Sequence, residues 1–161
     1  MKLLILDRDG VINFDSDNYI KNPEEWRPIP GSLDAIARLT QNGWRIAVAT
    51  NQSGISRGLF EMETLNAMHA KMHKAVAQAG GRVEAVFYCP DSAASQSACR
   101  KPMPGMLLAI SERFNMPLLG VPAIGDSLRD LQAASAVGAR PILVLTGKGK
   151  KTRKQGDLPA G

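Results

Sequence analysis

Two aspartates stand two positions apart directly after an aliphatic run at the start of the chain. Residues 3–6 are Leu, Leu, Ile and Leu, and Asp7, Arg8, Asp9 and Gly10 follow them. Alternate side chains of an extended segment point to the same side, so the Asp7 and Asp9 carboxylates can face one reacting group. Such a pair suits a nucleophile beside a proton donor, or two hard oxygen ligands for Mg²⁺. A D-x-D-G tetrapeptide also recurs by chance as a polar turn, so the rest of the chain must decide.

Two further polar residues follow later apolar stretches in the same way. Thr50 comes after residues 45–49, and Asp126 comes after residues 121–125. Apolar runs in which apolar and polar residues do not alternate indicate strands buried on both faces, as in a parallel sheet covered by helices. Because such sheets bind ligands at the carboxyl ends of their strands, we expect Asp7, Thr50 and Asp126 at one edge. Lys101 is expected to share their pocket.

Phosphoryl transfer is the reaction that suits this set of groups, because it needs an in-line nucleophile and dispersal of charge on the phosphoryl oxygens. Asp7 would attack and form an aspartyl phosphate, while Asp9 would protonate the leaving alcohol and then activate water. Asp7, Asp126 and the main-chain carbonyl of Asp9 would supply part of an oxygen shell for Mg²⁺. Together with Mg²⁺, three groups would bind or neutralise the phosphoryl oxygens: the Thr50 hydroxyl, the Asn51 main-chain N–H and the Lys101 ammonium.

Two other motifs have plain structural interpretations. Ser127 and Asp130 match a capping box at a helix start, so Asp130 is open equally to a capping or a functional role. His69 and His73 are one helical turn apart, but no H-E-x-x-H pattern surrounds them. We therefore expect these histidines on a solvated or partly packed helix face.

The elements that must position these residues alternate between strand and helix along the chain. Apolar runs predict strands at residues 3–6, 45–49, 83–88, 121–124 and 141–145. Periodicity of 3.6 residues predicts helices from an N-cap at Ser32 to Gly43, over 65–76, over 105–114, and from 128 to Gly138. This alternation predicts an α/β fold with a doubly wound parallel sheet. The loop at 13–31 is long for a mere connection, so it is expected to serve function.

The composition indicates one soluble domain. The chain of 161 residues has 44% hydrophobic and 22% charged residues, which is ordinary for a globular protein with a single core. No apolar run approaches the ~18 residues that span a bilayer, and the four aliphatic residues before Asp7 are too few for a signal peptide. We therefore expect a cytoplasmic protein with no membrane contact. No heptad or long apolar surface demands a partner, so a monomer is expected.

The positive charge is concentrated at the C-terminal end. The net charge is +5, and the last fourteen residues hold five basic side chains against Asp157, which leaves +4 in this segment: Lys148, Lys150, Lys151, Arg153 and Lys154. We divide the chain into a catalytic domain at 1–147 and a basic tail at 148–161. Because the tail has no interleaved aromatic residues, it is expected to be solvated chain, and no nucleic-acid partner is expected.

The ordered motifs resemble those of the haloacid dehalogenase-like (HAD) phosphatases, from Leu3 to about Gly149. D-x-D-G follows the first strand, Thr50 ends the second, Lys101 precedes a proline, and G-D-x-x-x-D follows a later strand. The resemblance implies a Rossmann-like HAD fold with little or no cap domain. It assigns Asp7 as nucleophile, Asp9 as acid and base, and catalytic or metal-binding roles to Thr50, Lys101 and Asp126.

Within these phosphatases, residues 50–58 (TNQSGISRG) and 99–106 (CRKPMPGM) are similar to the D-glycero-D-manno-heptose 1,7-bisphosphate 7-phosphatases of lipopolysaccharide core biosynthesis. The similarity implies Mg²⁺-dependent hydrolysis of the 7-phosphate of a small sugar bisphosphate. Histidinol-phosphate phosphatases have similar motifs and stay an alternative, as do, more remotely, a nucleic-acid-end phosphatase and a phospho-receiver module. The residues that the resemblance places against substrate are Asp15, Tyr19, Asn51, Gln52, Ser53, Arg100 and Lys101, with Arg100 suited to grip the second phosphate.

One loop departs from the pattern of that branch. Its members carry C-x-H and then C-x-C before R-K-P, whereas here the positions hold Cys89, Asp91, Ser97 and Cys99. Two thiolates with a carboxylate and a hydroxyl make a poor closed zinc site, so Zn²⁺ is expected to be absent or weakly held. Two cysteines are also too few for a disulfide framework, and nothing indicates an oxidising compartment. The loop is therefore expected to be held by its own packing.

Overall fold

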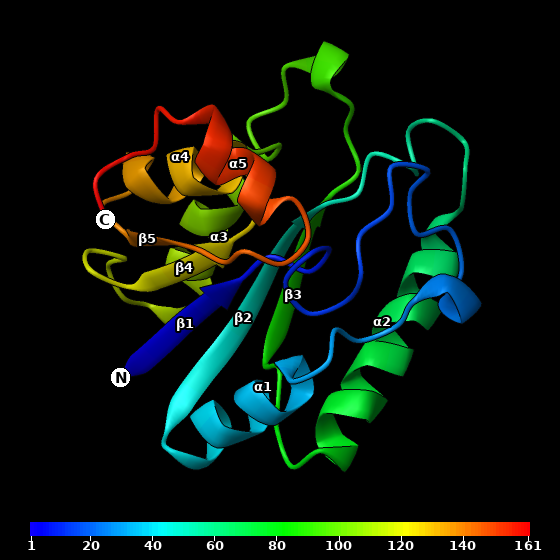
Figure 1. The fold of residues 1–161 in the computed structure, drawn as a ribbon, viewed down its shortest axis with the longest axis horizontal. Coiled ribbons are helices and arrows are strands. Elements are labelled where there is room, and N and C mark those ends of the chain that lie inside the picture. The colour runs from blue at the N-terminus through cyan, green and yellow to red at the C-terminus, as the bar shows by residue number, and fades with distance from the viewer.

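Five parallel strands form one sheet in the computed structural model, which describes residues 1–161 (Figure 1). The strands are β1 Lys2–Leu6, β2 Trp44–Asn51, β3 Ala85–Cys89, β4 Pro122–Gly125 and β5 Arg140–Leu143. Their order across the sheet is β3-β2-β1-β4-β5, and every neighbouring pair is parallel. The chain thus runs outward from β1 to one edge and then to the other. This confirms the predicted doubly wound α/β fold.

Helices cover both faces of the sheet. They are α1 Ser32–Gln41, α2 Met62–Gln78, α3 Gly105–Phe114, α4 Leu128–Ala136 and α5 Gly149–Gln155. Buried residues of α1 and α2 share one core cluster, and those of α3 and α4 share the other. Outside the core helices, the connections add only two single-turn 3-10 helices, η1 Pro23–Glu25 and η2 Ala93–Ser95. None of the helices is long and apolar enough to cross a membrane.

The aliphatic run of β1 is apolar throughout because helices cover it on both sides. Leu3 and Ile5 belong to the core cluster of α3 and α4. Leu4 and Leu6 point the other way and belong to the cluster of α1 and α2. The strand order reverses beside β1, between β4 and β2. Ligands bind at such a switch point, outside the carboxyl ends of the strands, and Asp7 and Asp126 flank it.

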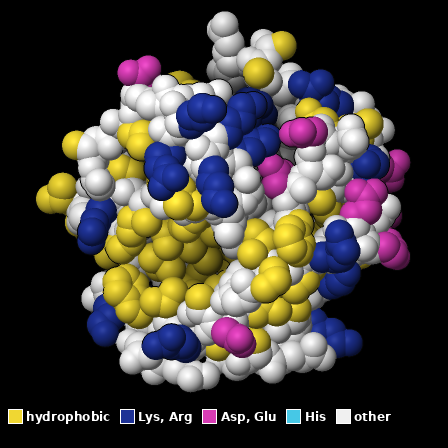
Figure 2. All heavy atoms as spheres, in the orientation of Figure 1, with side chains coloured by type: hydrophobic (Ala, Val, Ile, Leu, Met, Phe, Trp, Pro, Cys, Tyr) yellow, Lys and Arg dark blue, Asp and Glu magenta, His cyan; other side chains and the backbone are white.

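The basic segment after residue 147 is only partly as expected. Residues 149–155 form α5, and both Gly149 and Thr152 are buried, so the expectation of solvated chain is wrong for this helix. Thr152 Oγ1 donates a hydrogen bond of 2.7 Å to the main-chain oxygen of Asp126. The basic side chains remain on the exposed side, and Figure 2 shows Lys and Arg side chains gathered over α5 and the loops beside it. The helix therefore supports the loop that carries Asp126.

A smaller difference concerns the start of α1. Ser32 is the first helical residue, not the N-cap, and Gly31 occupies the cap position with φ of 87°. The Ser32 hydroxyl donates instead to the main-chain oxygen of Ile12, at 2.7 Å. A glycine fits the left-handed cap because it has no Cβ. The serine is thereby free to tie α1 to the turn that follows the two aspartates.

Candidate active site

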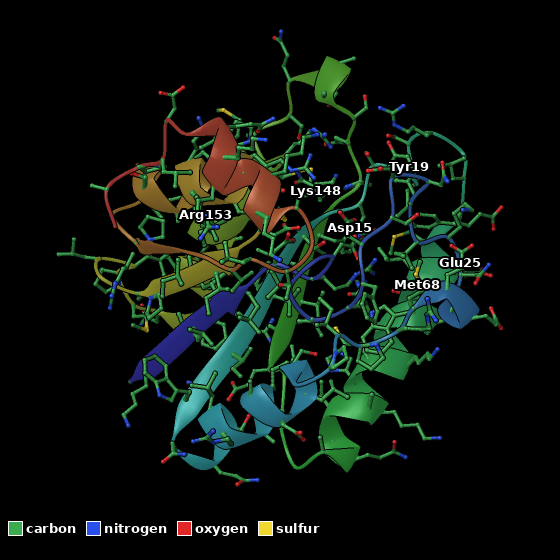
Figure 3. All side chains as sticks on the ribbon, viewed as in Figure 1. Asp15, Tyr19, Glu25, Met68, Lys148 and Arg153 are labelled. Carbon is green, nitrogen blue, oxygen red and sulfur yellow. A yellow bond between two sulfur atoms is a disulfide. The ribbon has the colours of Figure 1, made fainter.

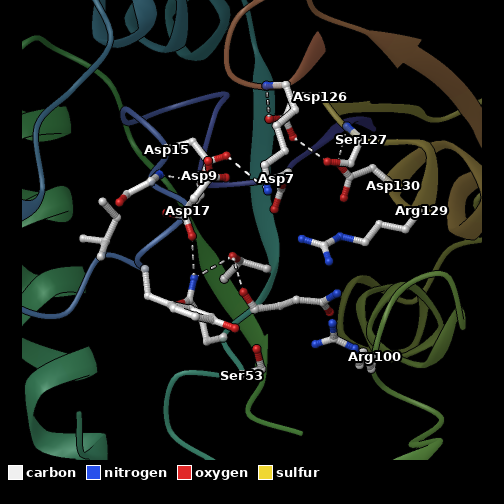
Figure 4. A pocket seen from close by; sticks show the side chains of 17 residues that line it. Asp7, Asp9, Asp15, Asp17, Ser53, Arg100, Asp126, Ser127, Arg129 and Asp130 are labelled. Atoms are coloured by element: carbon white, nitrogen blue, oxygen red, sulfur yellow. Dashed lines mark hydrogen bonds and ion pairs between the residues drawn. The ribbon is translucent and has the colours of Figure 1, made fainter. Parts of the chain in front are cut away.

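A polar pocket lies at the carboxyl edge of the sheet (Figure 4). Asp7 follows β1, Thr50 lies near the end of β2, and Asp126 follows β4, and all three line this pocket. Only two of its 17 lining residues are hydrophobic. The predicted gathering of these side chains at one edge is therefore observed, and the pocket suits a charged, strongly hydrated ligand.

Asp7 lies in a surplus of negative charge. Burial raises its pKa well above the ordinary value, and Asp130 adds to the rise while Lys101 opposes it. Lys101 Nζ is 3.4 Å from Asp7 Oδ1 and 2.9 Å from Asp130 Oδ1. Burial works to lower the pKa of Lys101, but Asp130 and Asp7 outweigh burial and raise it. The lysine is thus a fixed positive charge beside the predicted nucleophile.

Asp9 is held by three side chains. Arg8 Nε donates to its Oδ1 at 2.9 Å, and Asn13 Nδ2 donates to the same oxygen at 2.9 Å. Gln52 Nε2 donates to Oδ2 at 3.1 Å. Burial alone would raise the pKa of Asp9, but the charge of Arg8 and these hydrogen bonds lower it below the ordinary value. Asp9 is therefore a carboxylate in the free protein, with a fixed orientation at the pocket wall.

The carboxylates fit a divalent cation. One oxygen each from Asp7, Asp126 and Asp130 lie within 4.8 Å of one another. Burial raises the pKa of Asp126 to about 6, although the Lys148 main-chain N–H donates to its Oδ2 at 2.9 Å. No protein N–H is paired with the main-chain carbonyl of Asp9. Hard oxygen donors with uncompensated charge are what Mg²⁺ prefers, so the predicted donor set suits this ion.

Asp130 caps a helix, which is one of the two interpretations left open for it, and it also contacts Lys101. Its Oδ2 accepts a 3.1 Å hydrogen bond from the Ser127 main-chain N–H, in a capping box at the start of α4. Its Oδ1 holds Lys101 at 2.9 Å. The same carboxylate therefore caps a helix and orients the lysine, and because Lys101 occupies it, Asp130 is a weaker candidate for the metal than Asp7 or Asp126.

The loop after β2 joins the site through its side chains. Asn51 Oδ1 accepts from the Lys101 main-chain N–H at 3.1 Å, and Asn51 Nδ2 donates to the Lys101 carbonyl at 3.3 Å. Gln52 Nε2 donates to Thr50 Oγ1 at 2.9 Å. Asn51, Gln52 and Ser53 all line the pocket. Beyond the predicted substrate contacts, Asn51 thus anchors the segment that carries Lys101.

The long loop after β1 forms another wall of the pocket. Asp15 and Tyr19 both line it, as the resemblance implied. Asp15 Oδ2 is 3.6 Å from Lys148 Nζ, and Figure 3 shows these two side chains side by side between the loop and the start of α5. The Arg57 guanidinium lies over the Tyr19 ring, 5.6 Å from its centre. Lys148 belongs to the segment expected to be a solvated tail, so it was not predicted as a pocket residue.

Two arginines reach into the pocket from the same side (Figure 4). Arg100 was predicted, and its Nη1 donates to the Asp91 carbonyl at 3.1 Å. Arg129 was missed, because a basic residue in the first turn of a helix usually belongs to a solvated face. Burial lowers the pKa of Arg100, and the positive charge of Arg129 lowers it further. The one sign of a functional role for Arg129 in the sequence was its unfavourable position, because a cation at a helix N-terminus opposes the helix dipole.

The cysteine loop is closed by a bond that was not expected. Cys89 and Cys99 form a disulfide, so the loop is not held by its packing alone. Asp91 Oδ2 lies 3.8 Å from Cys89 Sγ and 3.6 Å from Cys99 Sγ, and Ser97 Oγ lies 3.2 Å from Cys99 Sγ. The four positions compared with a zinc loop thus converge, which brings the two sulfurs within bonding distance. Absent or weak zinc binding stays a prediction.

His69 also differs from expectation. It is 8% exposed, and its Nε2 lies 3.1 Å from Arg8 Nη1, so it is more deeply buried than the solvated or partly packed face that was expected. His73 is exposed. The helical spacing gave no sign of this contact, because Arg8 lies 61 residues away in the sequence.

Comparisons with known proteins agree on one kind of activity. Residues 2–124 match the model of the Polynucleotide kinase 3 phosphatase family, and residues 98–160 match that of the HAD-hydrolase-like family. The D-glycero-beta-D-manno-heptose-1,7-bisphosphate 7-phosphatase of Bordetella bronchiseptica is 60% identical over 161 residues, which cover 100% of this chain and 90% of the relative. The protein of the same name from Pseudomonas putida is 60% identical over 156 residues, with 97% of this chain and 89% of the relative covered.

Solved structures give the same picture. The crystal structure of D,D-heptose 1,7-bisphosphate phosphatase from B. bronchiseptica, complexed with magnesium and phosphate, has a TM-score of 0.98 at 60% identity and covers 100% of this chain and 90% of its own. That of D,D-heptose 1,7-bisphosphate phosphatase from Burkholderia thailandensis has a TM-score of 0.77 at 54% identity, with 100% and 89% covered.

Proposed function

The chain belongs to the D-glycero-D-manno-heptose-1,7-bisphosphate 7-phosphatase family of HAD phosphoric monoester hydrolases, and from this premise we propose that it removes the 7-phosphate of that sugar bisphosphate. The product would serve the synthesis of lipopolysaccharide core precursors. The observation that carries the proposal is the distribution of charge in the pocket. Asp7 lines the pocket, and Lys101, which is buried and does not itself line the pocket, lies 3.4 Å from the Asp7 carboxylate. Arg100 and Arg129 reach in as a second cationic group. Such a pocket suits a ligand with two phosphates.

In the first half of the proposed reaction, Asp7 attacks phosphorus while the bond to the sugar oxygen breaks. The product of this step is an aspartyl phosphate on Asp7 and a sugar hydroxyl. Asp9 protonates the departing oxygen, and its side chain is already held at the pocket wall by Arg8, Asn13 and Gln52. Lys101, 3.4 Å from Asp7, offsets negative charge at the reacting centre.

In the second half, Asp9 takes a proton from water, and the water oxygen attacks the phosphoryl group and releases phosphate and Asp7. Mg²⁺, held by Asp7, Asp126 and the Asp9 carbonyl, would neutralise phosphoryl oxygens and Asp7 together. Asp9 Oδ1 accepts from both Arg8 and Asn13, whereas Oδ2 accepts only from Gln52, so Oδ2 is the oxygen with a lone pair left to exchange the proton.

The charge of the pocket argues against histidinol phosphate as the preferred substrate. That molecule has a single phosphate, and it carries an ammonium group that the heptose bisphosphate lacks. Arg100 and Arg129 already oppose each other, since the charge of Arg129 lowers the pKa of Arg100. A further cation there would be repelled, whereas a second phosphate would be attracted.

A nucleic-acid end is the second candidate substrate, because residues 2–124 match the model of the Polynucleotide kinase 3 phosphatase family. The exposed basic side chains of α5 would suit a phosphate backbone. However, the arginines that line the pocket fit a second phosphate on a small sugar equally well, and the full-length relatives are sugar bisphosphatases.

Initial rates of phosphate release in the presence of Mg²⁺ test the proposal. The substrates are both anomers of the heptose bisphosphate, histidinol phosphate, a 3′-phosphorylated oligonucleotide and p-nitrophenyl phosphate. We expect kcat/KM for one heptose anomer to exceed that for the other substrates by several orders of magnitude. A preference for the oligonucleotide or for histidinol phosphate would contradict the proposal.

A further inference from the structure

A buried histidine lies behind the pocket against Arg8, and the proposed mechanism gives this histidine no role. Arg8 is 0% exposed and His69 is 8% exposed, and neither lines the pocket. Arg8 comes two residues after β1. Because alternate side chains of an extended segment point to the same side, Arg8 lies on the side of Leu4 and Leu6, which is the face that α2 covers. His69 lies on α2 and meets it there.

Two of the three guanidinium nitrogens of Arg8 have polar partners at hydrogen-bond distance, and the third lies close to a carboxylate oxygen without a hydrogen bond. Nε donates to Asp9 Oδ1 at 2.9 Å, and Nη2 lies 2.8 Å from the same oxygen as an ion pair without hydrogen-bond alignment. Nη1 lies 3.1 Å from His69 Nε2. An arginine buried without such partners would be strongly unfavourable, because a buried ion loses its hydration. The carboxylate and the imidazole together hold it.

The protonation of His69 follows from this contact. Arginine has five N–H donors and no acceptor, so His69 Nε2 must accept and the imidazole proton must lie on Nδ1. Burial, with Arg8 next, lowers the pKa of His69 to about 3, which agrees with a neutral ring. His69 therefore acts as a fixed acceptor for Arg8, with one tautomer, and it is not a proton donor to the reaction.

We propose that His69 is a positioning residue for Asp9: it holds the Arg8 guanidinium, and Arg8 holds Asp9 Oδ1, so that Oδ2 stays directed at the leaving-group oxygen. The proposal rests on the acid role of Asp9 in the proposed function. His69 touches no substrate in this scheme. Its effect passes through Arg8, whose rigid planar fork joins the two side chains.

A positioning role has a signature that a purely structural role lacks. When Asp9 works as an acid, its proton moves to the sugar oxygen as the P–O bond breaks, because an alkoxide is a poor leaving group. A p-nitrophenolate ion leaves without that proton. Misplacing Asp9 should therefore lower kcat/KM, which reports on the first half of the reaction, much more for an alkyl phosphate than for p-nitrophenyl phosphate. A loosened fold would slow both alike.

The experiment compares three variants. His69→Leu removes the acceptor, His69→Gln keeps an acceptor oxygen, and His73→Leu is the matched control one turn away on the exposed side of the same helix. We expect His69→Leu to lower kcat/KM for the heptose bisphosphate by about 10- to 100-fold, part of the roughly 10²- to 10⁴-fold that general acid–base catalysis contributes. We expect kcat/KM for p-nitrophenyl phosphate to stay within about threefold of wild type, because this ratio covers the reaction only up to the departure of p-nitrophenolate and leaves out the later step in which Asp9 activates water. His69→Gln should recover most of the loss, and His73→Leu should match wild type.

An equal loss on both phosphates, or full activity of His69→Leu on the sugar, would overturn the proposal. If His69→Leu fails to fold, the same rate ratio is measured for Arg8→Lys, since Lys keeps the charge but cannot reach both partners. A ratio equal to wild type in Arg8→Lys would then refute the proposal. The test does not depend on the proposed substrate, because any alkyl phosphate that the wild-type enzyme hydrolyses can replace the heptose bisphosphate.

Discussion

Replacing Arg129 with glutamine should weaken binding of the sugar bisphosphate and leave the chemical step almost unchanged. Arg129 is exposed, stands in the first turn of α4 and reaches into the pocket beside Arg100. No carboxylate lies within ion-pair distance of it. Both the helix dipole and Arg100 repel its charge, so its position is unfavourable until an anion binds. A phosphate that contacts Arg129 would offset both repulsions.

The expected size of the change in KM follows from the solvent exposure of Arg129. A hydrogen bond to a charged group contributes about 1.5–3 kcal/mol, and solvent screening at an exposed side chain reduces this to about 1–2 kcal/mol. Since about 1.4 kcal/mol is tenfold, KM for the bisphosphate should rise roughly 5- to 30-fold in Arg129→Gln. The value of kcat should stay within about twofold, because the interaction is equal in the ground and transition states.

The assay is steady-state phosphate release from the heptose 1,7-bisphosphate and from the heptose 7-phosphate, which lacks the second phosphate. The matched control is Arg153→Gln, which makes the same charge change on the exposed side of α5, outside the pocket. We expect the rise in KM only for Arg129→Gln and only with the bisphosphate. An equal rise with the monophosphate, or the same rise in Arg153→Gln, would refute the reasoning.

Three further predictions address other parts of the molecule. Asp9→Asn should lower kcat for the sugar phosphate by about 10²- to 10⁴-fold, and mass spectrometry should detect phosphate trapped on the protein; an unchanged rate would contradict the acid role. Because the pKa of His69 is about 3 in the fold and 6.5 as its reference value, the unfolded chain binds more protons between these pH values, so stability should fall as pH drops from 6.5 toward 3. Urea midpoints should show this acid loss in wild type and a smaller one in His69→Gln. Reduction of the Cys89–Cys99 disulfide, which closes a sequence separation of 10, should cost about 2–3 kcal/mol of stability, measured as a lower melting temperature with dithiothreitol than without it.

The sequence was informative where a signal repeats along the chain. The unbroken apolar run before Asp7 predicted a strand covered on both faces, and Leu3 and Leu4 do pack into opposite core clusters. Periodicity over residues 105–114 predicted α3 with its observed bounds. The strand ends then placed Asp7 and Asp126 at one edge without any knowledge of side-chain contacts.

What the sequence did not reveal depends on single contacts between distant segments. The seven residues of α5 are too few for a reliable helical period, and the helix is anchored by Thr152 on the main chain of Asp126. The burial of His69 depends on Arg8, and the pairing of Cys89 with Cys99 depends on how their loop folds back. The local sequence predicts none of these three contacts. In each case the contact depends on how distant segments, or the two ends of a loop, come together in the fold.

The two carboxylates of the D-x-D motif are perturbed in opposite directions, and each direction is the reverse of what the proposed chemistry needs. Burial and Asp130 raise the pKa of Asp7, which must attack as an anion, while Arg8 and hydrogen bonds lower the pKa of Asp9, which must donate a proton. A cation among the carboxylates around Asp7 would favour its charged form, and an anionic phosphate beside Asp9 would favour the protonated form. Both of these changes in protonation require a bound ligand, which is the cation for Asp7 and the phosphate for Asp9. We therefore expect the nucleophile and the acid to reach their working protonation states only when the cation and the phosphate are both bound.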